Sequence, residues 1–231
     1  MRDDAILLLG ATDLTLAIGR RFVETGLPLA GVVSPARAFT IGYSPHPVTN
    51  SRHVDLEPWC DAERLLFQRY TAPVDITTAA AATGATLALA AGWYHMIPRP
   101  VREHFRRGCL GVHASLLPRY RGGAPLNWAV INGDREAGVS LFELASGVDD
   151  GPLYGQRAFE ISGDDYIGEV VNKAEQATLE LVCDLFPRLL AGVVRAVPQT
   201  GTPSYSLQRQ PSDGVIDWAG HAEAIRSEEH T

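Results

Sequence analysis

The sequence predicts an α/β fold in which helices cover both faces of a mostly parallel sheet. In the first half of the chain, short apolar runs typical of buried strands alternate with longer amphipathic stretches typical of helices. With 231 residues, 45% of them hydrophobic and 20% charged, the chain has the size and composition of one substantial globular domain.

The elements are expected in a simple order. Strands are predicted over residues 5–9, 29–33, 86–91 and 109–112, and helices over residues 16–24, 62–70 and 101–105. The first of these helices is expected to end at Gly26, a residue type common at helix C-termini. Residues 34–50, which contain Pro35, Gly42, Pro45 and Pro47, are predicted to form a loop.

The second half contains two alternating segments, residues 139–144 and 153–161, and then helical spacing over residues 164–190. We assign residues 1–195 to one domain and residues 196–225 to the start of a truncated C-terminal appendage. Apolar residues at 215–218 are expected to pack either this appendage or a homodimer interface. Residues 226–231 interrupt a helix predicted to begin near His221 and match the translation of a common sequencing adapter, so we interpret them as an artefactual tail.

Composition argues against several classes of protein. No window approaches the run of about 18 apolar residues that a membrane span requires, and the polar start does not fit a secretory signal, so a cytoplasmic protein is expected. Cys60, Cys109 and Cys183 lack the spacing of zinc ligands or of a disulfide framework, so no metal is expected. A net charge of -7 argues against a broad contact with nucleic acid.

Two local features are less specific. Gly10 follows the first predicted strand, but the further glycines of a dinucleotide-binding motif are missing, so a tight turn is the better interpretation. A cluster of arginines either forms a solvated surface or binds an anionic substrate. Its members are Arg99, Arg102, Arg106, Arg107, Arg119 and Arg121.

The residues that point to chemistry lie between positions 108 and 155. His113 ends a predicted buried strand and precedes a Pro- and Gly-rich loop, at the sheet edge where open α/β folds bind ligands. Asp149 lies in a Val-Asp-Asp-Gly segment, whose residue types are also common in turns that have no catalytic role. Alone, His113 is better explained as a structural histidine, but together the two form a His/Asp pair able to move a proton near neutral pH.

Gly111-Val-His113, Ser115-Leu-Leu-Pro118 and Asp149-Asp-Gly151 resemble the signature of the formyltransferase family. That signature joins Asn-x-His, a Ser-Leu-Leu-Pro loop and a later Asp-x-Gly. The family includes methionyl-tRNA, glycinamide ribonucleotide and sugar-nucleotide formyltransferases. The resemblance covers residues 1 to about 218 and implies a Rossmann-like formyltransferase fold, with residues 1–195 as its catalytic domain.

The resemblance implies an enzyme in which an amine attacks the formyl carbon of 10-formyltetrahydrofolate. His113 is then expected to stabilise the tetrahedral oxyanion, and Asp149 to orient His113 and accept the amine proton. The pterin ring is expected on main-chain groups of His95, Met96 and Ile97 and of the loop Ala145, Ser146, Gly147, Val148 and Asp149. The residues expected to bind the amine substrate are Ser115, Arg119, Arg121 and Gly123.

One residue departs from the family pattern. Gly111 stands where the family has a catalytic Asn, and losing one oxyanion donor of this kind costs on the order of 3 kcal/mol in other enzymes. We expect a backbone amide, Ser115 or water to supply the missing donor, because the rest of the motif is retained. The alternatives are a slow enzyme and a non-catalytic folate- or nucleotide-binding module.

The amine is expected to belong to an amino sugar on a nucleotide carrier. Residues 119–128 and 208–218 resemble the sugar-nucleotide formyltransferases. The negative net charge of the chain suits a small substrate better than tRNA. The alternative is a methionyl-tRNA formyltransferase that is truncated before its C-terminal domain.

Overall fold

The first compact unit is built on parallel strands. The computed structural model describes residues 4–42 and 46–231, which divide into units at residues 1–111 and 112–231. In the first unit, β1 (Ala5–Leu9) lies between β2 (Leu29–Pro35) and β6 (Ala85–Ala90), β5 (Leu66–Tyr70) follows β2, and β7 (Cys109–His113) follows β6. Leu8 lies opposite Val32 and Leu89, and all three are fully buried. Burial of this kind requires that both faces of the sheet are covered.

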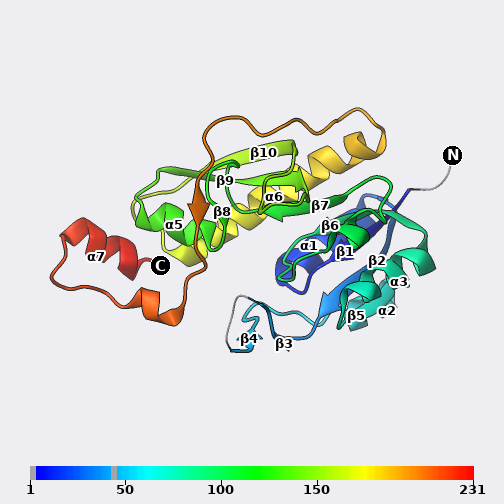
Figure 1. The fold of residues 1–231 in the computed structure, drawn as a ribbon, viewed down its shortest axis with the longest axis horizontal. Coiled ribbons are helices and arrows are strands. Elements are labelled where there is room, and N and C mark those ends of the chain that lie inside the picture. The colour runs from blue at the N-terminus through cyan, green and yellow to red at the C-terminus, as the bar shows by residue number, and fades with distance from the viewer. Residues whose placement is uncertain (1–3, 43–45) are drawn as a thin grey trace. The chain divides into compact units, whose positions relative to one another are not determined.

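Three helices pack against this sheet (Figure 1). Helix α1 (Asp13–Glu24) packs on β1 and β2, and α2 (Glu57–Glu63) packs on β5. Helix α3 (Pro73–Thr83) packs on β6, β1, β2 and β5. Crossovers between parallel strands are right-handed, so the return from β5 to β6 places α3 on the face opposite α1 and α2. The unit also contains the short pair β3 (Ala38–Phe39) and β4 (Val48–Thr49) and the one-turn helix α4 (Arg99–Arg102).

The helix predicted over residues 62–70 is wrong. Helix α2 ends at Glu63, Arg64 takes a left-handed φ of 58°, and β5 begins at Leu66. Leu66 lies opposite Gly31 and Tyr70 opposite Pro35 in a parallel pairing. The apolar residues of this stretch fit both helical and strand spacing, and pairing with β2 decides between them.

Other boundaries differ in smaller ways. The predicted loop at residues 34–50 contains the end of β2 and the two-residue strands β3 and β4, and Pro45 lies outside the described residues. The helix predicted over 101–105 is the single turn α4. Helix α3 was not predicted from the sequence, because its alanine-rich stretch has no clear apolar stripe, although Pro73 at its start and Gly84 at its end are suitable helix signals.

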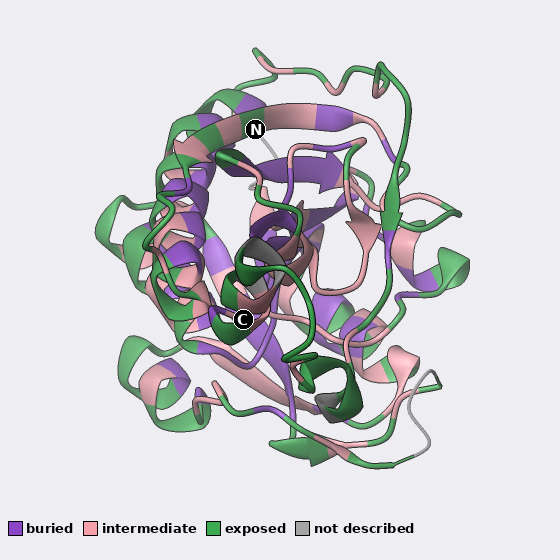
Figure 2. Ribbon diagram, turned by 90° about the vertical axis from the view of Figure 1, so that its left-hand side faces the viewer, coloured by how far each residue is buried: buried purple, intermediate pink, exposed green. Residues whose placement is uncertain are grey.

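The second unit is organised around an antiparallel pair and a long helix. Strands β9 (Glu136–Glu143) and β10 (Leu153–Glu160) pair antiparallel, and α6 (Ile167–Leu190) packs on both. Helix α6 buries an apolar stripe that includes Val170, Leu181 and Phe186. Figure 2 shows how buried, intermediate and exposed residues are distributed along the helices and strands. The predicted strands and long helix of this region are therefore confirmed, with shifted ends.

The remaining elements of the second unit are short. They are β8 (Arg121–Gly122), α5 (Pro125–Ile131), β11 (Tyr205–Ser206), a 3-10 turn (Pro211–Gly214) and α7 (Ala222–Glu229). Strand β11 pairs in parallel with β8. Val215 and Trp218, which were expected to pack an appendage or a dimer interface, are 77% and 74% exposed.

Strand pairing joins these elements into a mostly parallel sheet with the order β10-β9-β7-β6-β1-β2-β5. Within this sheet, β9 and β10 pair antiparallel, whereas the pairings of β1 with β2 and β6, of β2 with β5 and of β6 with β7 are parallel. The predicted α/β fold class is confirmed. None of the helices described is long and apolar enough to cross a membrane.

Candidate active site

His113 is the last residue of β7, and its side chain is 11% exposed. Its Nε2 lies 2.7 Å from the carbonyl oxygen of Tyr120. A carbonyl oxygen only accepts, so this hydrogen bond requires a proton on Nε2. The carbonyl of Tyr120 therefore sets the orientation of the imidazole ring.

Asp149 lies in the turn between β9 and β10 and faces His113. Its Oδ2 accepts a hydrogen bond of 2.8 Å from the backbone N–H of Gly122 and lies 3.5 Å from Nδ1 of His113. Its backbone takes a left-handed φ of 49°, a conformation that Asp tolerates better than most residues. The structure thus brings the predicted His/Asp pair together within one unit.

The loop after His113 is anchored by buried polar groups. The hydroxyl of Ser115 donates to the carbonyl of Arg119 at 2.6 Å, and the fully buried Ser140 donates to the carbonyl of Ser115 at 2.6 Å. Gln156 donates to the carbonyl of Leu117 at 2.9 Å. Because the hydroxyl hydrogen of Ser115 is engaged in this loop, Ser115 is poorly suited to replace the missing oxyanion donor.

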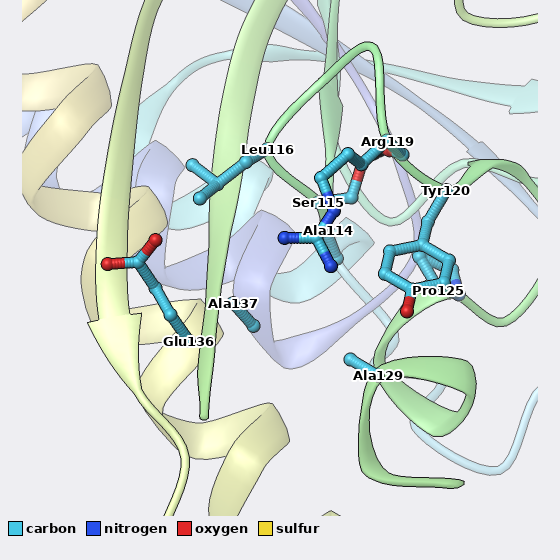
Figure 3. Close-up of a pocket in the computed structure, with 9 residues that line it drawn as sticks. All are labelled: Ala114, Ser115, Leu116, Arg119, Tyr120, Pro125, Ala129, Glu136 and Ala137. Atoms are coloured by element: carbon cyan, nitrogen blue, oxygen red, sulfur yellow. Dashed lines mark hydrogen bonds between the residues drawn. The ribbon is translucent and has the colours of Figure 1, made fainter. Parts of the chain in front are cut away.

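A small pocket lies beside this loop (Figure 3). Ser115, Arg119 and Tyr120 line it together with Pro125 and Ala129 of α5 and Ala137 of β9. Its volume of about 10 Å³ corresponds to roughly one water site. The pocket is therefore too small to hold an amine substrate.

The predicted substrate-binding arginines are engaged within the protein. Arg119 pairs with Asp134 at 2.7 Å, and the hydroxyl of Tyr120 donates to the same carboxylate at 2.9 Å. Arg121 donates to the side-chain oxygen of Gln199 from Nη2 at 2.7 Å and from Nε at 3.2 Å.

Gly123 is pressed against the segment after β11. Its N–H donates to the carbonyl of Ser206 at 2.9 Å, and a Cβ at this position would lie 2.5 Å from the backbone nitrogen of Gln208. Only glycine allows this approach.

Gly111 lies two residues before His113 in β7 and is buried. It lies opposite Ala90 of β6. Because side chains alternate along a strand, an Asn here would lie on the same face as His113.

The residues predicted to hold the pterin ring belong to different units. In the first unit, the His95 ring lies among Phe39, Tyr70 and Trp93 at centroid distances of 4.9, 4.7 and 5.6 Å. Its Nε2 is buried without a hydrogen-bond partner, and burial lowers the pKa of His95. Met96 is 71% exposed and Ile97 is 5% exposed, so Met96 does not join the aromatic cluster.

In the second unit, the loop from Ala145 to Asp149 is closed by a hydrogen bond of 3.1 Å from the N–H of Gly147 to the Asp150 carboxylate. A Cβ on Gly147 would lie 2.2 Å from that carboxylate, so any larger residue here would displace the Asp150 side chain. Val148 is 49% exposed.

Sequence reasoning missed two contributors to this site. Tyr120 orients His113 through its main chain, which carries no sequence signal. Gln199 donates to the carbonyl of Asp149 at 2.7 Å and to that of Gly151 at 2.8 Å. It was overlooked because it lies in the segment assigned to a C-terminal appendage. Within the described residues, no group of three His, Cys, Asp or Glu is arranged to hold a metal ion.

The fold and this pair define an α/β protein with a His/Asp site at the end of a sheet strand. A model of the family described as "Formyl transferase" matches residues 42–185. The chain therefore belongs to the formyl transferase family.

The relatives that the chain resembles in sequence include methionyl-tRNA formyltransferases from several bacteria. The chain is 29% identical over 235 residues to the methionyl-tRNA formyltransferase of Halalkalibacterium halodurans, covering 95% of this chain and 69% of that protein. It covers only 42–47% of several other methionyl-tRNA formyltransferases.

Solved structures share the fold. An N-formyltransferase from Helicobacter canadensis, in complex with folinic acid and dTDP-3-aminofucose, matches 97% of this chain and 79% of its own with a TM-score of 0.75 at 14% identity. The methionyl-tRNA formyltransferase of Clostridium thermocellum matches 99% of this chain and 82% of its own with a TM-score of 0.65 at 16% identity.

Proposed function

We propose that this protein transfers the formyl group of 10-formyltetrahydrofolate to the amine of a nucleotide-linked amino sugar. The observation that carries the proposal is the contact between His113 and Asp149, held in place by the N–H of Gly122 and the carbonyl of Tyr120. Family membership supports formyl transfer as the chemistry.

In the proposed reaction, the substrate amine forms a bond to the formyl carbon, and the bond from that carbon to N10 of the folate breaks. His113 stabilises the negative charge on the formyl oxygen by redirecting its Nε2–H from the carbonyl of Tyr120 to that oxygen. Asp149 holds the ring and accepts the proton released by the amine, and N10 of the leaving folate takes up a proton as its bond to the formyl carbon breaks. Gly111 contributes no side-chain donor, so backbone N–H groups or water take that part, less effectively than an Asn amide would.

Bound 10-formyltetrahydrofolate supplies the activated formyl carbon. Main-chain groups of His95, Met96 and Ile97 and of the loop Ala145–Asp149 are proposed to hold its pterin ring. The side chain of His95 offers one contact besides its main chain, because its buried Nε2 has no hydrogen-bond partner and a polar group of the ligand would satisfy it.

The charge distribution favours a small substrate over tRNA. In the arginine cluster, Arg106 and Arg107 both pair with Asp4, Arg99 pairs with Glu103, and Arg119 pairs with Asp134. Paired arginines release few counterions from a nucleic acid, and the net charge is -7.

Methionyl-tRNA is the second candidate substrate. The curated relatives above favour it, because they are methionyl-tRNA formyltransferases at 29–35% identity. The two substrates differ in size, charge and salt dependence, so one panel of assays separates them.

The test is conversion of 10-formyltetrahydrofolate to tetrahydrofolate, followed by absorbance with nucleotide-linked amino sugars and methionyl-tRNA. Turnover with one amino sugar is expected, and His113→Ala is expected to reduce it by about 100-fold or more. Turnover with methionyl-tRNA alone would reassign the substrate. Folate binding without turnover for any amine would contradict the enzyme and indicate a binding module.

A homodimer is also proposed, with Val215 and Trp218 at its interface. Both side chains are largely exposed, which suits residues that a second copy covers. Light scattering of wild type and Trp218→Ser is the measurement, with loss of the dimer in the variant as the expected result.

A further inference from the structure

Gln199 lies in the segment between α6 and the 3-10 turn and contacts the turn that carries Asp149. Residues 200–205 are exposed, and so are Val197 and Pro198, but Gln199 between them is partly buried. Its side-chain amide makes four hydrogen bonds, two as donor and two as acceptor.

The two donors are directed at the turn that carries Asp149. Nε2 of Gln199 donates to the carbonyl of Asp149 at 2.7 Å and to the carbonyl of Gly151 at 2.8 Å. These two hydrogen bonds fix the backbone of the turn at Asp149, which has a left-handed φ, and two residues later at Gly151. A non-glycine residue keeps such a conformation only where its surroundings fix it.

The acceptor atom of Gln199, Oε1, faces β8, the strand that binds the Asp149 carboxylate. Oε1 of Gln199 accepts hydrogen bonds from Nε and Nη2 of Arg121. Nη1 of Arg121 donates to the Tyr205 hydroxyl at 3.0 Å. The residue after Arg121 is Gly122, whose N–H donates to the Asp149 carboxylate at 2.8 Å.

These contacts form a closed ring of hydrogen bonds through Gln199, Asp149, Gly122 and Arg121. One part of the ring fixes the backbone of Asp149 and the other fixes its carboxylate. Only an amide fits the position of Gln199, because it must donate to two carbonyls and accept from a guanidinium.

We propose that Gln199 is a positioning residue that sets the carboxylate of Asp149 toward His113. This inference rests on the proposed formyl transfer, in which Asp149 is the proton acceptor. Gln199 has no place in that reaction except through Asp149. Through this single side chain, the segment assigned to a C-terminal appendage contributes to the site.

Two substitutions in the full chain separate the hydrogen bonds that Gln199 donates to the Asp149 turn from those that it accepts from Arg121. Gln199→Ala removes all four hydrogen bonds, whereas Gln199→Glu keeps an acceptor for Arg121 and loses both donors to the Asp149 turn. Both variants are expected to lower kcat by about 10- to 100-fold, the usual cost of a misplaced catalytic group, with less change in the KM of the amine. The exposed neighbour Thr200→Ala is the matched control and is expected to keep wild-type kcat.

A double-mutant cycle distinguishes positioning from general destabilisation. If Gln199 acts through Asp149, Gln199→Ala has no further effect on kcat in an Asp149→Ala background. The same fold loss in both backgrounds would overturn the proposal. So would a fully active Gln199→Glu, because it would mean that the Arg121 contact alone matters.

The imidazole of His113 gives a readout that does not depend on turnover. In protein with ¹⁵N-labelled histidine, Gln199→Ala is expected to shift the ring resonances of His113, and Thr200→Ala is expected to leave them in place. If wild type shows no turnover, the proposed function fails while this measurement still decides the role of Gln199. Unchanged His113 resonances in Gln199→Ala would contradict the positioning role.

Discussion

Gly111 and His113 occupy the same face of β7, and this is the residue-scale feature with the clearest consequence for chemistry. Gly111→Asn is expected to place an amide donor beside His113 and to raise kcat by up to about 100-fold, the range over which a single oxyanion donor acts. The measurement is steady-state formyl transfer with the preferred amine.

Gly111→Ala is the control for this substitution, because it adds volume to a buried position without adding a donor. It is expected to give no gain in kcat and some loss of thermal stability. A folded Gly111→Asn protein with wild-type kcat would mean that a backbone N–H or water already supplies the donor.

At the same scale, motif chemistry identified the His/Asp pair but not the partners that orient it. His113 and Asp149 stand in a family signature, whereas the carbonyl of Tyr120 is a main-chain group and Gln199 lies 50 residues after Asp149. Contacts over such a separation leave no local spacing to detect. For the same reason, the ion pair that engages Arg119 could not be predicted.

Helix α3 shows how single side chains fix an element. Oδ2 of Asp75, in the first turn, accepts hydrogen bonds from the N–H of Thr71 at 2.6 Å, from the Thr71 hydroxyl at 2.8 Å and from the N–H of Ala72 at 2.8 Å. Burial raises the pKa of Asp75, but these hydrogen bonds outweigh it and lower the pKa below its usual value.

Asp75→Ala is therefore expected to destabilise the protein by about 1 kcal/mol near neutral pH, the usual effect of losing a helix cap. Because the folded-state pKa is lowered, the contribution is complete above about pH 4 and is lost as the pH falls through the folded-state value. Urea unfolding at several pH values is the measurement. A wild-type advantage that grows in acid would contradict this assignment.

Element by element, the buried parallel strands were predictable because β1, β2, β6 and β7 are continuous apolar runs. Strand β5 was not, because it is an edge strand whose residues are mostly half-buried and whose pattern fits either period. Edge strands depend on pairing with a neighbour, which a local pattern does not contain.

At the scale of the whole molecule, the compact units divide the chain within β7, at Gly111, whereas composition changes only near residue 195. A division inside a continuous buried strand leaves no Pro- or Gly-rich linker to recognise. The segment after α6 also returns to the loop beyond His113, where the N–H of Arg121 donates to the carbonyl of Ser204 at 2.9 Å. Such a return depends on tertiary contacts rather than on composition.

Net charge bears on the choice between the two proposed substrates at this scale. With 20 basic and 27 acidic residues, the chain presents an unfavourable surface to a polyanion. For a nucleotide-linked amine, kcat/KM is expected to fall by no more than about tenfold between roughly 50 and 200 mM salt. For a tRNA held by many phosphate contacts, the expected loss over the same range is about a thousandfold or more. A steep loss with the small amine would indicate that unpaired cations dominate its binding and that the arginine pairs open when substrate arrives.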